Sequence, residues 1–284
     1  MPSIVSERTE SEAPDNPGTR SSDPYDKHYA SLRESLQDKI RREAFEDYFG
    51  QFSGVSTANF DRFFRWLDLT RNSFVLDVAC GSGAPALRLA RSVECTVVGI
   101  DRNARAIADA TELAREQGLS ERVRFERHDA NQPLPFPEST FDAALCIDAL
   151  AHLSDHRRIF AAWARVLKGG GRLLFTTSVM TGPLSNVEIA VRTRDGYFLL
   201  HPPGSHERLL EEAGFELLRR EDISADQAEI ARRFCVALTT HADAIRAAEG
   251  DAVFEEEYRF RAVIEQVARE RRLSHIVFLS RKRV

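Results

Sequence analysis

Clustered cysteines and long hydrophobic runs are both missing from this chain of 284 residues. Its four cysteines lie far apart, with neither metal-binding nor redox spacing, so we expect buried free thiols. No apolar stretch approaches the roughly 20 residues of a membrane-spanning helix, and the N-terminus lacks a basic segment followed by an apolar one. We therefore expect a cytoplasmic protein with no membrane span.

An excess of positive charge is absent as well. Lys and Arg total 39, whereas Asp and Glu total 44, which gives a formal net charge of −5. This balance provides no electrostatic case for a nucleic-acid partner or an anionic membrane. We therefore expect a small-molecule partner, and the sequence leaves open whether two copies form a homodimer.

The first residues differ in composition from the rest of the chain. Residues 1–23 are rich in Ser, Pro, Glu and Asp and have almost no apolar side chains. Such a segment cannot bury enough surface to offset the entropy lost on ordering, so we expect a disordered tail. Residues 24–284 can bury one substantial core, because 43% of the chain is hydrophobic, and we expect a single domain there.

The most informative stretch is residues 74–90, FVLDVACGSGAPALRLA. A short apolar run with one acid, a glycine-rich segment and an apolar helical pattern predict a buried strand, a tight loop and a helix. Gly81 and Gly83 let the backbone turn sharply and approach a ligand without a Cβ atom in the way. Pro85 suits the first turn of the helix, where its missing N–H would have no partner. The stretch therefore predicts a small-molecule cradle at the carboxyl end of a strand.

Two classes of ligand use such a loop. Residues 81–86 satisfy the G-x-G-x-x-G/A pattern of dinucleotide-binding proteins. Asp77 argues against a dinucleotide, because its carboxylate would face the charges of a pyrophosphate, whereas it would attract an ammonium group. The run VLDVACGSG resembles the first motif of class I S-adenosylmethionine-dependent methyltransferases, whose cofactor carries an ammonium and no phosphate. A nicotinamide-dependent oxidoreductase and a noncatalytic S-adenosylmethionine-binding protein remain alternatives.

The rest of the chain alternates apolar strands with amphipathic helices, which predicts an α/β fold with an open, mostly parallel sheet. The resemblance implies a Rossmann-like sheet of seven strands, with the last strand antiparallel in a final hairpin. We expect N-terminal helices over residues 24–70 and a core over 71–223 and 275–284. Residues 224–274 have a helical pattern far longer than a strand pair requires, and they predict a helical cap inserted before the last strand.

Acids at the ends of successive strands are expected to hold the cofactor. Asp101 lies 24 residues after Asp77, and its carboxylate can accept hydrogen bonds from both ribose hydroxyls. The resemblance implies that Asp129 holds the adenine and that Tyr25 or Tyr29 folds over the cofactor as a lid. The expected cofactor contacts are Asp77, Ala79, Cys80, Gly81, Gly83, Asp101, Arg102, Asp129, Ala130, Ile147 and Tyr25.

Methyl transfer from a sulfonium needs few catalytic groups, because the cofactor carries the reactivity. A hydroxyl acceptor would need a base, and His152 is the candidate because imidazole titrates near neutrality. An amine or carbon acceptor needs no base, and His152 would then orient the substrate. Related O-methyltransferases often have two adjacent histidines and an acid here, where this chain has Ala151-His152 and Thr176-Thr177. The expected acceptor contacts are Asp148, His152, Glu188, Arg192 and Tyr197.

A bound divalent metal is not expected, because the strand ends carry no cluster of Asp, Asn and Glu beyond the residues assigned to the cofactor. His156, His201 and His206 are scattered along the chain, and we expect loop or surface roles for them. Taken together, these features predict an enzyme that moves a methyl group from S-adenosylmethionine to O, N or C of a small metabolite, in specialised metabolism.

Overall fold

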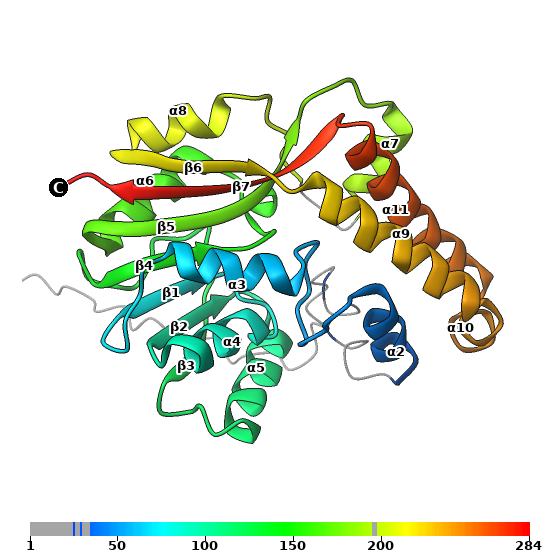
Figure 1. The fold of residues 1–284 in the computed structure, drawn as a ribbon, viewed down its shortest axis with the longest axis horizontal. Helices are drawn as coiled ribbons and strands as arrows, with labels where there is room; N and C mark the ends of the chain where they lie inside the picture. Colours follow the sequence, from blue (N-terminus) through cyan, green and yellow to red (C-terminus); the bar gives the residue numbers. More distant parts are fainter. Residues whose placement is uncertain (1–24, 26–28, 30–34, 195–197) are drawn as a thin grey trace, which may run out of the picture.

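The chain folds around a mixed sheet of seven strands, shown by a computed structural model that describes residues 25, 29, 35–194 and 198–284 (Figure 1). The strand order is β3-β2-β1-β4-β5-β7-β6. The strands are β1 (Phe74–Val78), β2 (Thr96–Asp101), β3 (Val123–Arg127), β4 (Phe141–Cys146), β5 (Leu167–Met180), β6 (Phe215–Asp222) and β7 (Leu273–Lys282). Strand β7 runs antiparallel to β5 and β6, and the other pairs are parallel, which confirms the expected topology. The expected disordered tail lies outside the described residues.

Helices cover both faces of the sheet, because the side chains of a parallel strand alternate between two buried surfaces. Leu76 joins one apolar cluster with residues of α6 and α8, and Val75 joins a second with residues of α3 and α4. The helices are α2 (Ser35–Ala44), α3 (Thr57–Trp66), α4 (Ala84–Val93), α5 (Ala104–Glu116), the 3₁₀ helix η1 (Leu150–His152), α6 (His156–Val166), α7 (Asn186–Arg192), α8 (Ser205–Glu212), α9 (Ser224–Thr240), α10 (Ala242–Glu249) and α11 (Asp251–Arg269).

A third apolar cluster lies beyond the sheet and joins α2 to α9, α10 and α11. The rings of Phe45 and Phe234 meet edge to face within it, with centroids 5.7 Å apart. Figure 1 shows α9, α10 and α11 extending past the sheet beside α2. These helices come from the segment between β6 and β7, where the sequence predicts an inserted cap.

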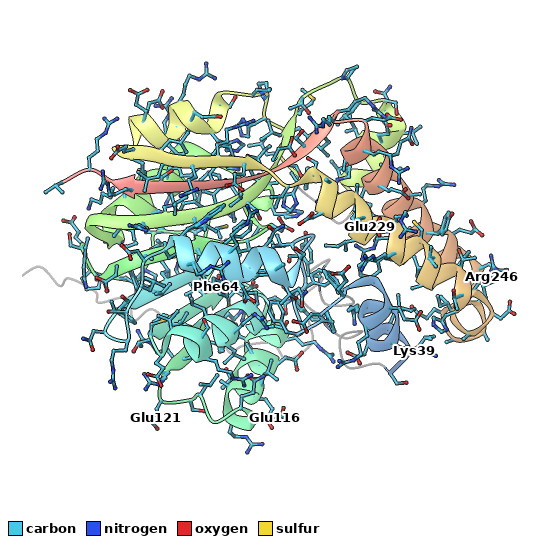
Figure 2. The ribbon with its side chains drawn as sticks, viewed as in Figure 1. Lys39, Phe64, Glu116, Glu121, Glu229 and Arg246 are labelled. Carbon is cyan, nitrogen blue, oxygen red and sulfur yellow. The ribbon has the colours of Figure 1, made fainter. Side chains whose placement is uncertain are left out.

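Burial follows the expected division between the core and the outer surface. Figure 2 shows Glu116 and Glu121 at the outer edge of the molecule, where both are exposed, whereas Phe64 is only 5% exposed. All four cysteines are free and buried, as the sequence predicts. Within the described ranges, no helix has both the length and the apolar character needed to cross a bilayer.

Candidate active site

A cavity of about 270 Å³ lies at the carboxyl ends of β1, β2 and β4. The loop after β1 forms one wall, and residues of α2, α9 and α11 form the opposite one. The strand order reverses between β1 and β4, because β2 and β3 follow on one side and β4 and β5 on the other. Open α/β sheets bind their ligands outside the strand ends at such a reversal, so the cavity is the candidate active site.

The sequence predicted most of one side of this cavity. All but one of the expected cofactor contacts line it, although they come from four strand ends and the N-terminal segment. They are Tyr25, Asp77, Ala79, Cys80, Gly81, Asp101, Arg102, Asp129, Ala130 and Ile147. These residues are far apart in the sequence, and only their positions at strand ends indicated that they would lie close together.

Gly83 is the exception, because it lies behind the loop and does not line the cavity. A Cβ atom there would come within 2.5 Å of the Phe125 ring and 2.8 Å of the Ala110 Cβ atom, and the backbone φ angle is +79°. The glycine allows the loop to pack against β3 and α5. The structure gives this glycine a packing role, and its cofactor contact stays a prediction.

Asp77 is the most unusual charged group in the cavity wall. Its side chain is 3% exposed, and its Oδ2 atom has no hydrogen-bond partner among the described residues. Burial, followed by the nearby negative charge of Asp101, raises the pKa of Asp77 to about 8. A buried carboxylate with an unsatisfied oxygen is costly without a cation or a donor. The site therefore fits the ammonium end of a ligand such as S-adenosylmethionine.

Asp101 ties the motif loop to the end of β2. Its Oδ2 atom accepts a hydrogen bond from the Gly81 N–H at 3.0 Å, and its Oδ1 atom accepts one from the Asn103 N–H at 2.8 Å. Asn103 in turn caps the N-terminus of α5 by accepting from the Ala106 N–H. A carboxylate has about four acceptor positions, so Asp101 can hold the loop and also meet ribose hydroxyls.

Two tyrosines from the N-terminal segment line the cavity, Tyr25 beside His152 and Tyr29 beside Gly81. The Tyr25 hydroxyl lies 3.1 Å from the ring nitrogens of His152. The Tyr29 hydroxyl lies 3.1 Å from the position that a Cβ atom on Gly81 would occupy, and Tyr29 is 7% exposed. Both tyrosines line the cavity, and their role as a lid over the cofactor stays a prediction.

We expect Gly81→Ala to weaken cofactor binding about tenfold, or about 1.4 kcal/mol, because its Cβ atom would push against the Tyr29 hydroxyl beside the motif loop. The φ angle of Gly81 is +54°. Gly118→Ala is the matched control, since Gly118 has a φ angle of +66° and nothing lies within 4 Å of its Cβ position. Titration calorimetry with S-adenosylhomocysteine should show a loss of affinity for the first variant alone. Equal affinities in the two variants would contradict the contact with Tyr29.

Asp148, at the end of β4, holds several segments together. Its Oδ1 atom accepts hydrogen bonds from Thr176 Oγ1 and His275 Nε2, each at 2.6 Å, and its Oδ2 atom accepts one from the Gly54 N–H at 2.7 Å. Burial alone would raise the pKa of this carboxyl, but His275 and the other donors hold it below its usual range. Asp148 lines the cavity as expected, although its carboxylate bonds mainly to the protein.

The other expected acceptor contacts have different outcomes. His152 and Arg192 line the cavity, and the His152 ring lies edge to face with the ring of Phe198, with centroids 5.2 Å apart. Glu188 does not line the cavity: its carboxylate pairs with Arg272 at 2.5 Å and caps α7 through Ser185. The structure gives Glu188 a capping and ion-pairing role, and its contact with the acceptor stays a prediction. Tyr197 lies outside the described residues.

Arginines at the far end of the cavity were not predicted. Arg41, Arg194 and Arg261 line it beside the expected Arg192. Burial lowers the pKa of both Arg41 and Arg261, and the Arg261 guanidinium lies 4.2 Å from the centre of the Phe234 ring. Helical periodicity does not reveal this group, because α2 and α11 carry many charged residues on their exposed faces.

The histidines expected in separate loop or surface positions are brought together. His156, His201 and His206 form one cluster, and His156 and His206 are only 3% and 1% exposed. The three residues lie on different segments, so their separation along the chain gave no signal. The expectation of loop or surface roles is corrected for this group.

Comparison with known proteins agrees with the geometry of the cavity. Residues 75–171 match a family described as a methyltransferase domain. Methyltransferase GfsG of Streptomyces halstedii is 35% identical over 170 residues, which cover 58% of this chain and 60% of that protein. The match thus spans about three fifths of that relative's length.

A second relative and a solved structure extend the likeness over more of the chain. The 27-O-demethylrifamycin SV methyltransferase of Amycolatopsis mediterranei (strain S699) is 29% identical over 201 residues, covering 69% of this chain and 74% of that protein. The crystal structure of the [4+2]-cyclase SpnF has a TM-score of 0.69 and 27% identity, covering 90% of this chain and 94% of that chain. The likeness therefore extends over most of the chain, beyond residues 75–171.

Proposed function

The chain belongs to the class I S-adenosylmethionine-dependent methyltransferases, and on this premise we propose that it transfers a methyl group from S-adenosylmethionine to an oxygen, nitrogen or carbon atom of a small metabolite. The buried carboxylate of Asp77 carries this proposal, because its Oδ2 atom has no partner among the described residues. An ammonium group would be attracted there, whereas a pyrophosphate would be repelled. Likeness to the 27-O-demethylrifamycin SV methyltransferase supports an acceptor from specialised metabolism.

The residues along the strand ends have separate roles in binding. Asp77 would pair with the ammonium of the cofactor, Asp101 would accept from the ribose hydroxyls, and Asp129 would accept from the adenine amine. S-adenosylmethionine supplies an electrophilic methyl group on a sulfonium when it is bound. Tyr29 beside Gly81 and Tyr25 beside His152 would exclude water from the cavity, since both line it.

His152 is the candidate base where the acceptor is a hydroxyl. Its ring lies between the Tyr25 and Phe198 rings, and the Tyr25 hydroxyl within hydrogen-bond distance would orient it. An imidazole nitrogen held in this way can take the acceptor proton as the methyl group is transferred. For an amine or a carbon acceptor, the same ring would position the acceptor without taking a proton.

We propose that the acceptor carries an anionic group beside an apolar body. Arg41 and Arg261 are guanidiniums whose pKa burial lowers, and both line the cavity with Phe234 and Phe260. A buried cation is stabilised when an anion reaches it, and guanidinium binds carboxylate and phosphate through paired hydrogen bonds. Glu257 pairs with the neighbouring Arg194 at 2.5 Å, and its negative charge also acts on Arg41 and Arg261.

A direct test of the reaction uses the full chain with methyl-labelled S-adenosylmethionine and a panel of small metabolites. We expect calorimetric binding of S-adenosylhomocysteine, no binding of nicotinamide dinucleotides, and label transferred to at least one acceptor. The likeness to a [4+2]-cyclase favours, as a second candidate, an enzyme that closes a ring in a small molecule without methyl transfer. Cofactor binding with conversion of an acceptor but no transferred label would favour that candidate.

We expect Arg261→Met to lower the affinity for phenyl phosphate about tenfold or more, since a hydrogen bond to a charged group contributes about 1.5–3 kcal/mol. Methionine keeps much of the apolar contact with Phe234 and removes the charge. Binding is measured with S-adenosylhomocysteine present, and phenol serves as the neutral probe. Arg281→Met, on an exposed residue of β7, is the control and should leave phenyl phosphate binding unchanged. An equal loss for phenol would contradict the anionic group.

A further inference from the structure

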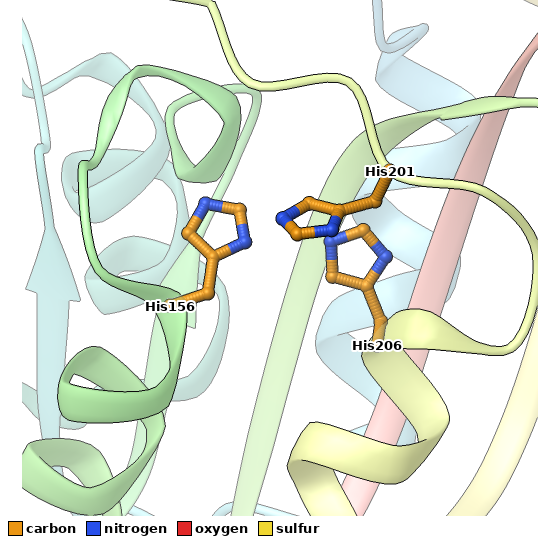
Figure 3. A group of neighbouring side chains, drawn as sticks. All are labelled: His156, His201 and His206. Carbon is orange, nitrogen blue, oxygen red and sulfur yellow. The ribbon is translucent and has the colours of Figure 1, made fainter.

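Three histidines meet beside the active-site cavity without lining it. His156 is the first residue of α6, and His206 lies in the first turn of α8. His201 lies in the segment before α8, where its carbonyl accepts a hydrogen bond from the Met180 N–H at 2.8 Å and its backbone pairs with Val179 of β5. Figure 3 shows the three rings facing one another from these separate segments.

The nitrogens of this cluster are largely unsatisfied. His156 donates its Nε2–H to the Leu150 carbonyl at 2.8 Å, which leaves the lone pair on Nδ1. Among the described residues, no hydrogen-bond partner reaches His156 Nδ1, His201 Nε2 or either ring nitrogen of His206. A buried polar atom without a partner costs about 1–3 kcal/mol, so a group of them at one point indicates a missing ligand.

The chemistry of the rings selects the kind of ligand. The metal-ligating side chains grouped at this point are three imidazoles. Neutral imidazole is the preferred ligand of zinc, copper and nickel, whereas magnesium and calcium prefer oxygen.

The ligand nitrogens lie somewhat farther apart than they would around a bound metal ion. One ligand nitrogen from each residue lies within 4.8 Å of the other two. Tetrahedral zinc, with Zn–N distances of about 2.0–2.1 Å, would bring the nitrogens to about 3.3 Å from one another. Small side-chain rotations cover this difference. Ring packing is the competing explanation, since the His156 and His201 centroids are 4.7 Å apart, but packing leaves the nitrogens without partners.

We propose that His156, His201 and His206 bind one zinc-like divalent transition-metal ion, with water as the fourth ligand. None of the three rings lines the cavity, which gives the ion a structural role. The Nε2–H bond from His156 to the Leu150 carbonyl is the outer contact that orients a metal ligand. The ion would join α6, α8 and the segment of residues 198–204 before α8.

The position of the site links it to the acceptor end of the cavity. Leu150 begins η1, which carries His152, and the Ala151 carbonyl accepts a hydrogen bond from the Leu199 N–H at 2.7 Å. Phe198, next to Leu199, packs on the His152 ring. An ion that fixes His156 to His201 would therefore fix the distance between η1 and the segment that carries Phe198.

The test is a titration of the metal-free full chain with Zn²⁺, followed by Co²⁺ as a spectroscopic probe. We expect one equivalent of Zn²⁺ to bind with a dissociation constant below about 1 μM. Bound Co²⁺ should show the visible absorption of a tetrahedral site. His206→Phe should weaken Zn²⁺ binding more than about 100-fold. Removing a residue that only hydrogen-bonds to a metal ligand typically costs about 10- to 100-fold, so a larger loss indicates a direct ligand. The phenylalanine ring can pack against Phe175 and Phe278, which already border His206.

His241→Gln is the control, because His241 pairs with Glu43 on another part of the molecule and should leave Zn²⁺ binding unchanged. His201→Gln tests the same site at a half-buried position and serves if His206→Phe fails to fold by circular dichroism. Binding of one equivalent that either cluster variant abolishes supports the site. No binding by the native chain, or binding that survives in the cluster variants, overturns it and leaves three packed neutral rings.

Discussion

Replacing Asp77 by asparagine is expected to weaken S-adenosylhomocysteine binding about 100-fold at pH 8, or about 2.7 kcal/mol, because a charged hydrogen bond to the ligand's ammonium is lost. The carboxylate is 3% exposed, so solvent screens that interaction little. Calorimetry on the native chain and the variant measures the difference. Asp61→Asn, which removes an acid paired with Arg88 outside the cavity, should leave the affinity unchanged.

The pH dependence of binding provides a second readout of Asp77. Its pKa is raised to about 8 without ligand, and the ammonium favours the ionised carboxylate, so binding below pH 8 must release a proton. The affinity of the native chain should therefore fall up to about tenfold for each unit below pH 8, whereas that of the asparagine variant should change little. Equal slopes for both chains would exclude Asp77 as the ammonium partner.

The stability of the ligand-free protein should change with pH in the direction opposite to the affinity. The folded-state pKa of Asp77 lies above its ordinary value of 3.8, so the ligand-free native chain loses stability from this group as the pH rises from about 4 to about 8. Asp77→Asn removes that loss. At pH 8 the variant should be the more stable protein without ligand and the weaker binder, a combination that general unfolding cannot produce.

Asp148→Ala is expected to destabilise the protein by about 3 kcal/mol, because breaking a buried ion pair or network typically costs about 3–5 kcal/mol. The side chain is 20% exposed and its partner His275 is 1% exposed, which places the value at the lower end. The φ angle of Asp148 is +54°, a conformation that aspartate tolerates better than alanine. Denaturant unfolding at pH 7 measures the loss.

Asp148→Asn is the matched variant, since asparagine keeps an acceptor for Thr176 and also tolerates the left-handed backbone. We expect it to lose less than half as much stability as the alanine variant. The folded-state pKa of Asp148 lies below its ordinary value of 3.8, so its stabilising effect is present above about pH 4 and disappears at lower pH. Equal losses in both variants would show that the charge alone matters.

The meeting of the strand-end residues in one cavity could be predicted because the signals for it are local. Asp77 and Asp101 each end an apolar strand, and parallel strands bring such ends to one edge of the sheet. Gly81 and Gly83 were identified by the same loop pattern, but the pattern could not separate the glycine that faces the cavity from the one that packs on Phe125. That distinction depends on which elements lie behind the loop.

The acceptor side depends on contacts between distant segments, which a single sequence does not show. Asp148 and His275 are 127 residues apart and bond only because β4 and β7 both border β5. Arg41 and Arg261 reach one end of the cavity from α2 and α11. Glu188 had a clear local role as the cap of α7, and its pairing with Arg272 follows from the position of β7.

The place of β7 has a consequence for how the protein folds during synthesis. Strand β7 pairs with β5 on one side and β6 on the other, although β6 and the three helices α9 to α11 precede it in the chain. The edge of β5 therefore stays open until residues 273–282 have left the ribosome, and β6 has no partner strand before then. We expect the β1 to β4 half to form early and the sheet to close in a late, slow step, because pairing over such sequence separations is slow. The nascent chain should be most prone to aggregation in that interval.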